Sequence, residues 1–230
     1  MSLLSGNAFG RPRSSLFSPR RFRDPTLGIQ ACPTFRITND DRVLCMGSCF
    51  ARAVGRMLRE SGIASTFAGQ THRYNAFTIL QALRWATTET FEPRHLVVLD
   101  DGRVYDPHDR TEVHEGYATL DEAYESGRVA IETLRTELAR ADVFVMTLGL
   151  VEVWYDRATG TALNHMPPRR AIASFDDRFE IRATTHDANR EAIRDIFALL
   201  RAARPEIRIL CSVSPIPLRA TWCHDDVFVA

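Results

Sequence analysis

The 230-residue sequence contains no lysine, because all 29 of its basic residues are arginine. This absence excludes a Schiff-base enzyme, a Walker A phosphate loop and a kinase-type lysine, since each of them depends on a lysine amine. Arginine can still clamp carboxylates or phosphates, so anionic ligands remain possible. The basic residues balance 29 acidic ones, and the zero net charge gives no reason to expect a nucleic acid or a membrane as a partner.

Long apolar runs and regularly spaced cysteines are missing as well. No run approaches the roughly 18 residues that a membrane span requires, and no apolar stretch follows the N-terminal arginines as it would in a secretory signal. The five cysteines are Cys32, Cys45, Cys49, Cys211 and Cys223. Their odd number and irregular spacing favour a reducing compartment, so we expect a cytoplasmic protein without a disulfide framework. A metal site at Cys211, Cys223 and His224 would need a further ligand, and we expect neither a metal nor another cofactor.

The hydrophobic periodicity predicts strands and helices that alternate along the chain. Strands are expected at 43–46, 63–67, 142–148 and 207–213, helices at 49–60, 76–85, 120–140 and 187–203, and hairpins around 101–102 and 158–160. This alternation predicts an α/β fold, with an open and mostly parallel sheet, helices on both sides and hairpin insertions. Residues 1–35 are rich in Ser, Pro and Arg and are expected to form a loosely ordered arm before a domain at 36–230. Because the sequence stops within an apolar run, we expect that domain to lack its C-terminal segment.

The segment from Arg42 to Ala51 is the most informative part of the chain. It reads as a short apolar strand, a glycine turn at Gly47 and a helix, with two possible nucleophiles, Ser48 and Cys49, at the turn. Such a turn exposes its side chains at the carboxyl edge of a parallel sheet and points a helix N-terminus at the same place. The pattern therefore predicts a site for chemistry on a carbonyl group.

The five residues Gly47-Ser48-Cys49-Phe50-Ala51 resemble the signature of the GSCFA family, a bacterial group within the SGNH (GDSL-like) hydrolase superfamily. Four later segments resemble further blocks of that family in the same order. They are 71–75, 104–107, 147–154 and 213–221. The resemblance runs from about residue 35 to the end of the sequence.

This resemblance implies a flavodoxin-like, three-layer αβα fold and O-ester chemistry. The protein would be an esterase or O-acyltransferase that acts on an acylated carbohydrate or a polysaccharide precursor. Alignment of the glycines places Cys49 at the nucleophile position of the superfamily and Ser48 at its aspartate position. Gly149 and Glu152 match the first and last places of its Gly-x-Asn-Asp block, with Val151 where the oxyanion asparagine belongs.

Two departures from the superfamily pattern bear on activity. Valine cannot donate a hydrogen bond, and the loss of one oxyanion donor typically costs on the order of 10²–10³ in rate. Asn75 is the expected substitute, since its block ordinarily lines the same hole, and His72 beside it is the best placed of the seven histidines. The Asp-x-x-His that supplies the general base in the superfamily is expected beyond Ala230.

Each candidate residue also has a plain structural interpretation. Cys49 is equally compatible with packing at a tight turn, Ser48 with capping of the helix, Asn75 with a turn or cap, and Glu152 with a charge on a hairpin. The alternative function is therefore a ligand-binding domain that has kept the fold and lost catalysis. A nucleotide-binding doubly wound domain is disfavoured because no Gly-rich phosphate turn follows any strand. The sequence leaves the oligomeric state open.

Overall fold

The computed structural model describes residues 32–68, 71–108, 116–174, 177–214, 221 and 223. The chain divides into two units, residues 1–36 and 37–230, and every element described below belongs to the second. The predicted N-terminal arm and the predicted C-terminal truncation both lie outside the described residues, apart from residues 32–35 of the arm.

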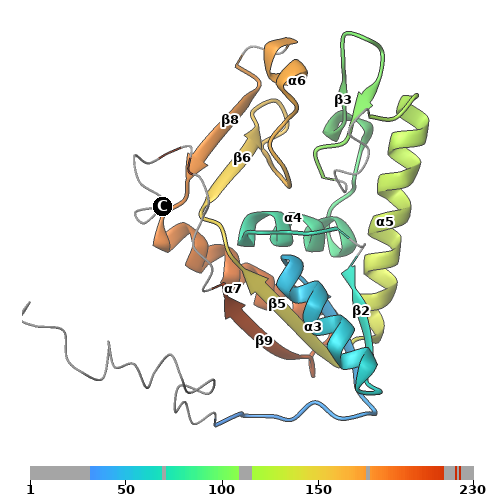
Figure 1. Ribbon diagram of the computed structural model, residues 1–230, viewed down its shortest axis with the longest axis vertical. Coiled ribbons are helices and arrows are strands. Elements are labelled where there is room, and N and C mark those ends of the chain that lie inside the picture. The colour runs from blue at the N-terminus through green and yellow to red at the C-terminus, as the bar shows by residue number, and fades with distance from the viewer. Residues whose placement is uncertain are drawn as a thin grey trace, which may run out of the picture. The chain divides into compact units, whose positions relative to one another are not determined.

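A four-stranded parallel sheet forms the centre of the fold, with strand order β2-β1-β5-β9 (Figure 1). Its strands are β1 (Arg42–Met46), β2 (Ala64–Phe67), β5 (Val143–Leu148) and β9 (Arg208–Val213). β1 and β5 are near-continuous apolar runs, as expected for strands that are covered on both faces. Among these parallel strands the order is second, first, third, fourth, which confirms the predicted α/β sheet.

Helices cover both faces of this sheet. These helices are α3 (Cys49–Glu60), α4 (Ala76–Thr87), α5 (Leu120–Arg140) and α7 (His186–Ala203). The short helix α6 (Arg169–Ser174) packs elsewhere, with Ala171 against Val97 and Leu99. Leu44, Met46, Phe144 and Met146 face one side, where they join buried residues of α4, α5 and α7 in the largest core cluster. α3 packs on the opposite side, where Gly55 allows its backbone to approach Cys45. Burial there raises the pKa of the Cys45 thiol to about 11.

A second, antiparallel sheet lies beyond the carboxyl end of the parallel one (Figure 1). Its order is β7-β6-β8, with β6 (Glu152–Asp156), β7 (Thr161–Leu163) and β8 (Phe179–Ala183). The predicted hairpin around Gly160 corresponds to β6 and β7. The third strand, β8, was not predicted from the sequence. The other predicted hairpin is the short pair β3 (Val97–Val98) and β4 (Val104–Tyr105), preceded by the 3-10 turn Pro93–His95.

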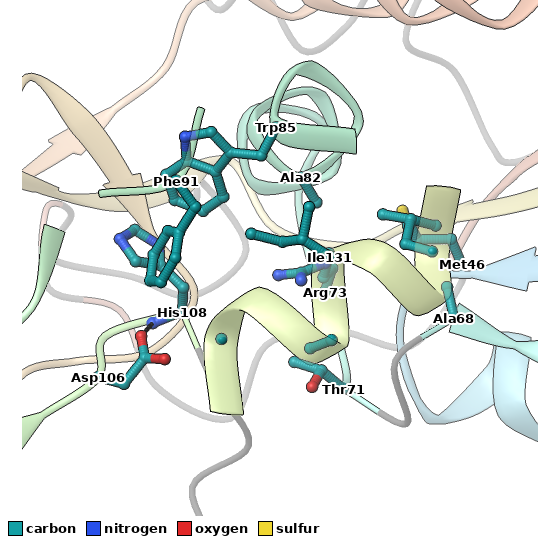
Figure 2. Close-up of a pocket in the computed structure, with 13 residues that line it drawn as sticks. Met46, Ala68, Thr71, Arg73, Ala82, Trp85, Phe91, Asp106, His108 and Ile131 are labelled. Atoms are coloured by element: carbon teal, nitrogen blue, oxygen red, sulfur yellow. Dashed lines mark hydrogen bonds between the residues drawn. The ribbon is translucent and has the colours of Figure 1, made fainter. Parts of the chain in front are cut away.

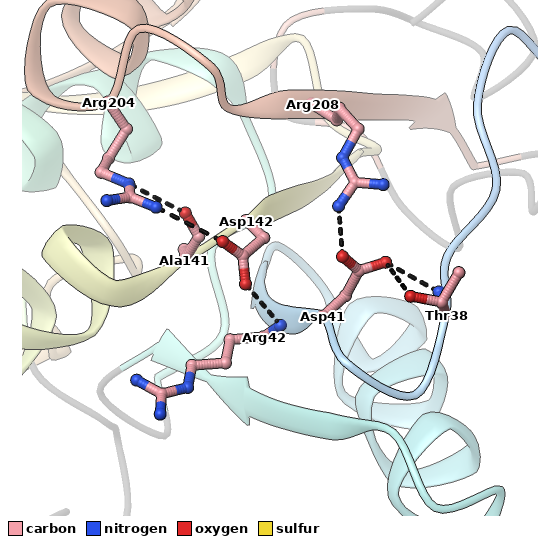
Figure 3. Close-up of polar contacts among 7 residues, drawn as sticks. All are labelled: Thr38, Asp41, Arg42, Ala141, Asp142, Arg204 and Arg208. Atoms are coloured by element: carbon pink, nitrogen blue, oxygen red, sulfur yellow. Dashed lines mark hydrogen bonds and ion pairs between the residues drawn. The ribbon is translucent and has the colours of Figure 1, made fainter.

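Charged side chains connect the amino ends of three parallel strands (Figure 3). Asp142 accepts a hydrogen bond from the Arg42 backbone N–H at 2.9 Å and pairs with Arg204 at 3.3 Å. Asp41 accepts from the Thr38 backbone N–H at 2.7 Å and pairs with the Arg208 guanidinium. The amino end of the sheet is therefore tied by ion pairs and hydrogen bonds between partly exposed side chains.

Candidate functional site

The turn after β1 passes directly against β5. Gly47 has a φ of +146°, and a Cβ atom there would lie 2.2 Å from the Thr147 hydroxyl oxygen and 2.6 Å from its carbonyl oxygen. The next backbone N–H, that of Ser48, donates to the same hydroxyl at 3.1 Å. Only glycine provides both the backbone conformation and the space, so this contact is the physical reason for the Gly at the turn.

The two candidate nucleophiles lie in different environments. Ser48 is 8% exposed and caps α3, since its Oγ accepts a hydrogen bond from the Phe50 N–H at 3.2 Å and lies 3.3 Å from the Thr147 hydroxyl. Cys49 is the first residue of α3 and is an exposed, free thiol. The Ser48 hydroxyl is therefore engaged in positioning the turn, whereas the Cys49 sulfur is accessible.

Residues His72–Asn75 form a strap across the carboxyl ends of the strands. The Arg73 N–H donates to the Gly47 carbonyl at 2.7 Å, and the Tyr74 carbonyl accepts from the N–H groups of Gly149 at 2.8 Å and Leu150 at 2.9 Å. At its start, the His72 carbonyl accepts from the Asn164 amide at 2.6 Å. The strap thus joins β1 and β5 through main-chain hydrogen bonds and the end of β7 through the Asn164 side chain.

Asn75 ends the strap and caps α4. Its Oδ1 accepts a hydrogen bond from the Thr78 N–H at 2.9 Å, and the side chain is buried. Capping uses only the oxygen of the amide. Among the described residues, no group accepts a hydrogen bond from Nδ2, which is the atom that could donate to a ligand oxygen. The cap interpretation is correct, and the predicted role in an oxyanion hole remains a prediction.

Gly149 and Glu152 follow β5, where the sequence placed them, but each has a defined partner. The N–H groups of Gly149 and Leu150 both point at the Tyr74 carbonyl. The Glu152 carboxylate accepts from the Cys223 N–H at 3.0 Å and from the Thr221 hydroxyl. Glu152 therefore holds Thr221 and Cys223 beside the site, and the Gly149 N–H serves the strap.

The strap carries two rings, of which that of Tyr74 lies near Cys49. The His72 ring lies 5.5 Å from the Phe67 ring and 6.1 Å from the Tyr74 ring. Burial raises the pKa of the Tyr74 phenol above its ordinary value of 10; the nearby Cys49 thiol raises it further, and Arg52 opposes this shift. Cys49 is thus close enough to Tyr74 to affect it electrostatically, although a whole helix and strand separate the two residues in the sequence.

A cavity of about 250 Å³ opens between the strap and the antiparallel sheet. Its lining residues are Tyr74, Asn75, Leu150, Glu152, Trp154, Leu163, Asn164, His165, Met166 and Ile181. Asn164 is 6% exposed, and its Oδ1 is buried without a hydrogen-bond partner among the described residues. The Asn164 Nδ2 donates to the His72 carbonyl, and it lies 3.0 Å from the His165 Nε2. The cavity therefore combines aromatic and apolar walls with a few polar groups, as ligand sites do.

Sequence reasoning did not identify Trp154, Asn164 or His165 as site residues. Trp154 lies within a segment that resembles a family block, and Asn164 and His165 directly follow β7, the second strand of the predicted hairpin. The signal for Asn164 and His165 is their position at the end of a strand, because polar side chains that follow a strand lie at the edge of its sheet.

A second, smaller cavity lies inside the domain behind the strap (Figure 2). Its volume is about 30 Å³, and Arg73, Asp106 and His108 are among its lining residues. Burial, with the charge of Arg73 next, holds the pKa of His108 well below its ordinary value of 6.5, and the ring packs edge-on against Trp85 at 4.6 Å. With room for about two water molecules, this space is an interior cavity rather than a substrate site.

Two further features bear on function, namely groups of metal ligands and membrane-spanning helices. Within the described part of the chain, no group of three or more His, Cys, Asp or Glu side chains could hold a metal ion. No described helix is long and apolar enough to cross a membrane.

Neither a curated protein nor a solved structure matches the chain. A family model does match it, over residues 42–230, and the chain belongs to the GSCFA family.

Proposed function

We propose that this protein is an esterase or O-acyltransferase in which Cys49 is the nucleophile. The observation that carries the proposal is the contrast at the turn, where an exposed thiol begins α3 while the adjacent serine is buried as its cap. Cys49 follows a strand at the carboxyl edge of the sheet, and its sulfur lies beside the N–H groups of a helix N-terminus. By the superfamily resemblance, the substrate is an acylated carbohydrate or a polysaccharide precursor.

The reaction proceeds through a thioester. The Cys49 thiolate attacks the ester carbonyl carbon, and the carbonyl π electrons move to oxygen, which becomes an oxyanion. First-turn N–H groups of α3 and the Asn75 Nδ2 are the donors in reach of this edge. When the oxyanion collapses, the C–O bond breaks, and the departing alkoxide takes from solvent water the proton that the Cys49 thiol had released to it. Water or an acceptor hydroxyl then takes the acyl group from sulfur.

The cavity beside the strap is the proposed binding place for the alcohol part of the ester. Trp154 and Tyr74 give it aromatic surfaces, and the buried Asn164 Oδ1 is an acceptor for a hydroxyl group. Leaving such an acceptor unpaired costs about 1–3 kcal/mol. A bound hydroxyl that donates to it would therefore recover that free energy, which a hydrocarbon group could not do.

The experiment compares four proteins on a generic acyl ester such as p-nitrophenyl acetate. Cys49→Ala should lower turnover by on the order of 10³. Ser48→Ala should keep activity within about tenfold of the parent, because it removes a cap and not the attacking atom. Cys211→Ala is the matched control, since Cys211 is another exposed free cysteine, on β9. Equal turnover in all four proteins would refute the assignment of Cys49.

One observation favours a second candidate, a ligand-binding domain without catalysis. The N–H groups of Gly149 and Leu150, which follow the central strand β5, are both committed to the Tyr74 carbonyl and are not directed at the site. Intact-protein mass spectrometry after exposure to the ester separates the two functions. An esterase gains the mass of one acyl group at Cys49, whereas a binding domain retains the ligand non-covalently and keeps its mass.

A further inference from the structure

A groove of about 380 Å³ lies at the amino end of the parallel sheet, away from the turn at Gly47. It runs between α5 and the edge of the sheet formed by β1 and β2. Its lining residues are Arg42, Val43, Leu44, Arg59, Ala64, Ser65, Thr66, Glu137, Arg140 and Ala141. Three arginines from three different elements and a single glutamate therefore line one groove.

The pattern of ion pairs along α5 sets this groove apart. At the spacing i,i+3, Glu125 pairs with Arg128 at 2.6 Å and Glu132 pairs with Arg135 at 2.5 Å. Glu137 and Arg140 have the same spacing, but the Glu137 carboxylate instead accepts a hydrogen bond from the Thr66 hydroxyl at 2.9 Å. Among the described residues, Arg140 has no carboxylate partner.

The other two lining arginines also have no carboxylate partner among the described residues. The backbone N–H of Arg42 contacts Asp142, but Figure 3 shows its guanidinium pointing away from that carboxylate. No described residue forms an ion pair with the Arg42 side chain. Arg59 reaches over the edge strand, where its Nη1 donates to the Ser65 carbonyl at 3.1 Å. A neutral carbonyl leaves the positive charge of Arg59 uncompensated.

We infer that this groove is a binding site for a phosphorylated small molecule that carries more than one phosphoryl charge, such as a diphosphate ester. Guanidinium groups recognise phosphoryl oxygens through paired hydrogen bonds, and charge-assisted bonds of this kind are about twice as strong as neutral ones. The lining has three positive charges against one negative charge. A cavity of this volume is within the range of small-molecule sites and exceeds what a single phosphate would fill.

Inorganic pyrophosphate is the probe, titrated calorimetrically into the full chain at low ionic strength. Arg140→Gln and Arg42→Gln should each weaken its binding by about tenfold, because each removes one charge-assisted contact. Arg128→Gln is the matched control, since it changes an exposed arginine on α5 that already has a carboxylate partner. Glu137→Gln should tighten binding by a few-fold, because it removes the repelling carboxylate.

Two further measurements make the test decisive. Orthophosphate should bind more weakly than pyrophosphate. The Cys49→Ala variant should bind pyrophosphate as tightly as the parent, because the groove is separate from the proposed esterase site. This inference is therefore tested independently of the esterase proposal. Absence of any heat with pyrophosphate would overturn the inference. Equal losses in Arg140→Gln and Arg128→Gln would also overturn it, since they would mean diffuse attraction to an arginine-rich surface.

Discussion

The two ends of the parallel sheet are stabilised in different ways. At the carboxyl end, buried main-chain groups and small residues make the contacts, and the strap joins β1 to β5 through the carbonyls of Gly47 and Tyr74. At the amino end, the corresponding ties are ion pairs of partly exposed side chains, such as Arg204 with Asp142. The first arrangement tolerates little change in shape, and the second is sensitive to pH and salt. Geometry is therefore most tightly controlled at the end where we place the chemistry.

The largest expected effect comes from a methyl group at the turn. Gly47→Ala should destabilise the fold by about 3 kcal/mol or more, because it combines an unfavourable φ with a clash against Thr147. Gly62→Ala is the matched control, since Gly62 also has a positive φ of +84° but nothing within 4 Å of its added Cβ. That control should lose only about 1 kcal/mol. Urea denaturation measures both, and equal losses would show that the contact with β5 is unimportant.

An intermediate effect distinguishes the two residues of the turn. Ser48→Ala should cost about 1–2 kcal/mol, because it removes the cap of α3 and the contact with the Thr147 hydroxyl. Cys49→Ala should change the free energy of unfolding by less than about 0.5 kcal/mol, since the thiol is exposed. Thermal unfolding of both variants checks this. A larger loss for Cys49→Ala would favour the packing interpretation of that cysteine over the nucleophile.

The smallest effect is expected at the amino end and depends on pH. The hydrogen bond from the Thr38 N–H, followed by the Arg208 guanidinium, lowers the pKa of Asp41 below its ordinary value of 3.8. The carboxylate therefore stabilises the folded state above that pH, and this contribution disappears as the pH falls through the lowered pKa. Asp41→Asn should be less stable than the parent near neutral pH and equal to it in acid. A difference between the two proteins that stays constant with pH would contradict this linkage.

The parallel sheet could be predicted because its strands are strong local signals. The strand at 143–148 is a nearly continuous apolar run, and the glycine after 43–46 ends its strand clearly. β8 was missed although Phe179–Ala183 alternates apolar and charged residues, because a run of only five residues is a weak signal. Its Glu180 and Arg182 pair with each other, and the Arg182 guanidinium lies 4.8 Å from the centre of the Tyr155 ring on β6. Neither contact can be inferred from the five residue types of this segment alone.

The candidate site was predictable only in part, for a related reason. Residues 47–49 form a compact local pattern, and the sequence located them correctly after the first strand. The strap depends on main-chain hydrogen bonds, which carry no signal in side-chain identity. The cavity depends on Asn164, which reaches the His72 carbonyl across 92 positions of the sequence. Such a contact becomes visible only once the antiparallel sheet is placed beside the parallel one.

The strap has a consequence for the order in which the protein folds. β1 pairs with β5 in a register that joins Val43 to Val143, and the strap adds links from His72–Asn75 to Gly47, Gly149 and Asn164. Contacts between such distant positions require the closure of long loops, which makes folding slow. Helices such as α5 can form much earlier. Binding of a ligand at the Cys49 site should therefore appear late in refolding, once both sheets have assembled.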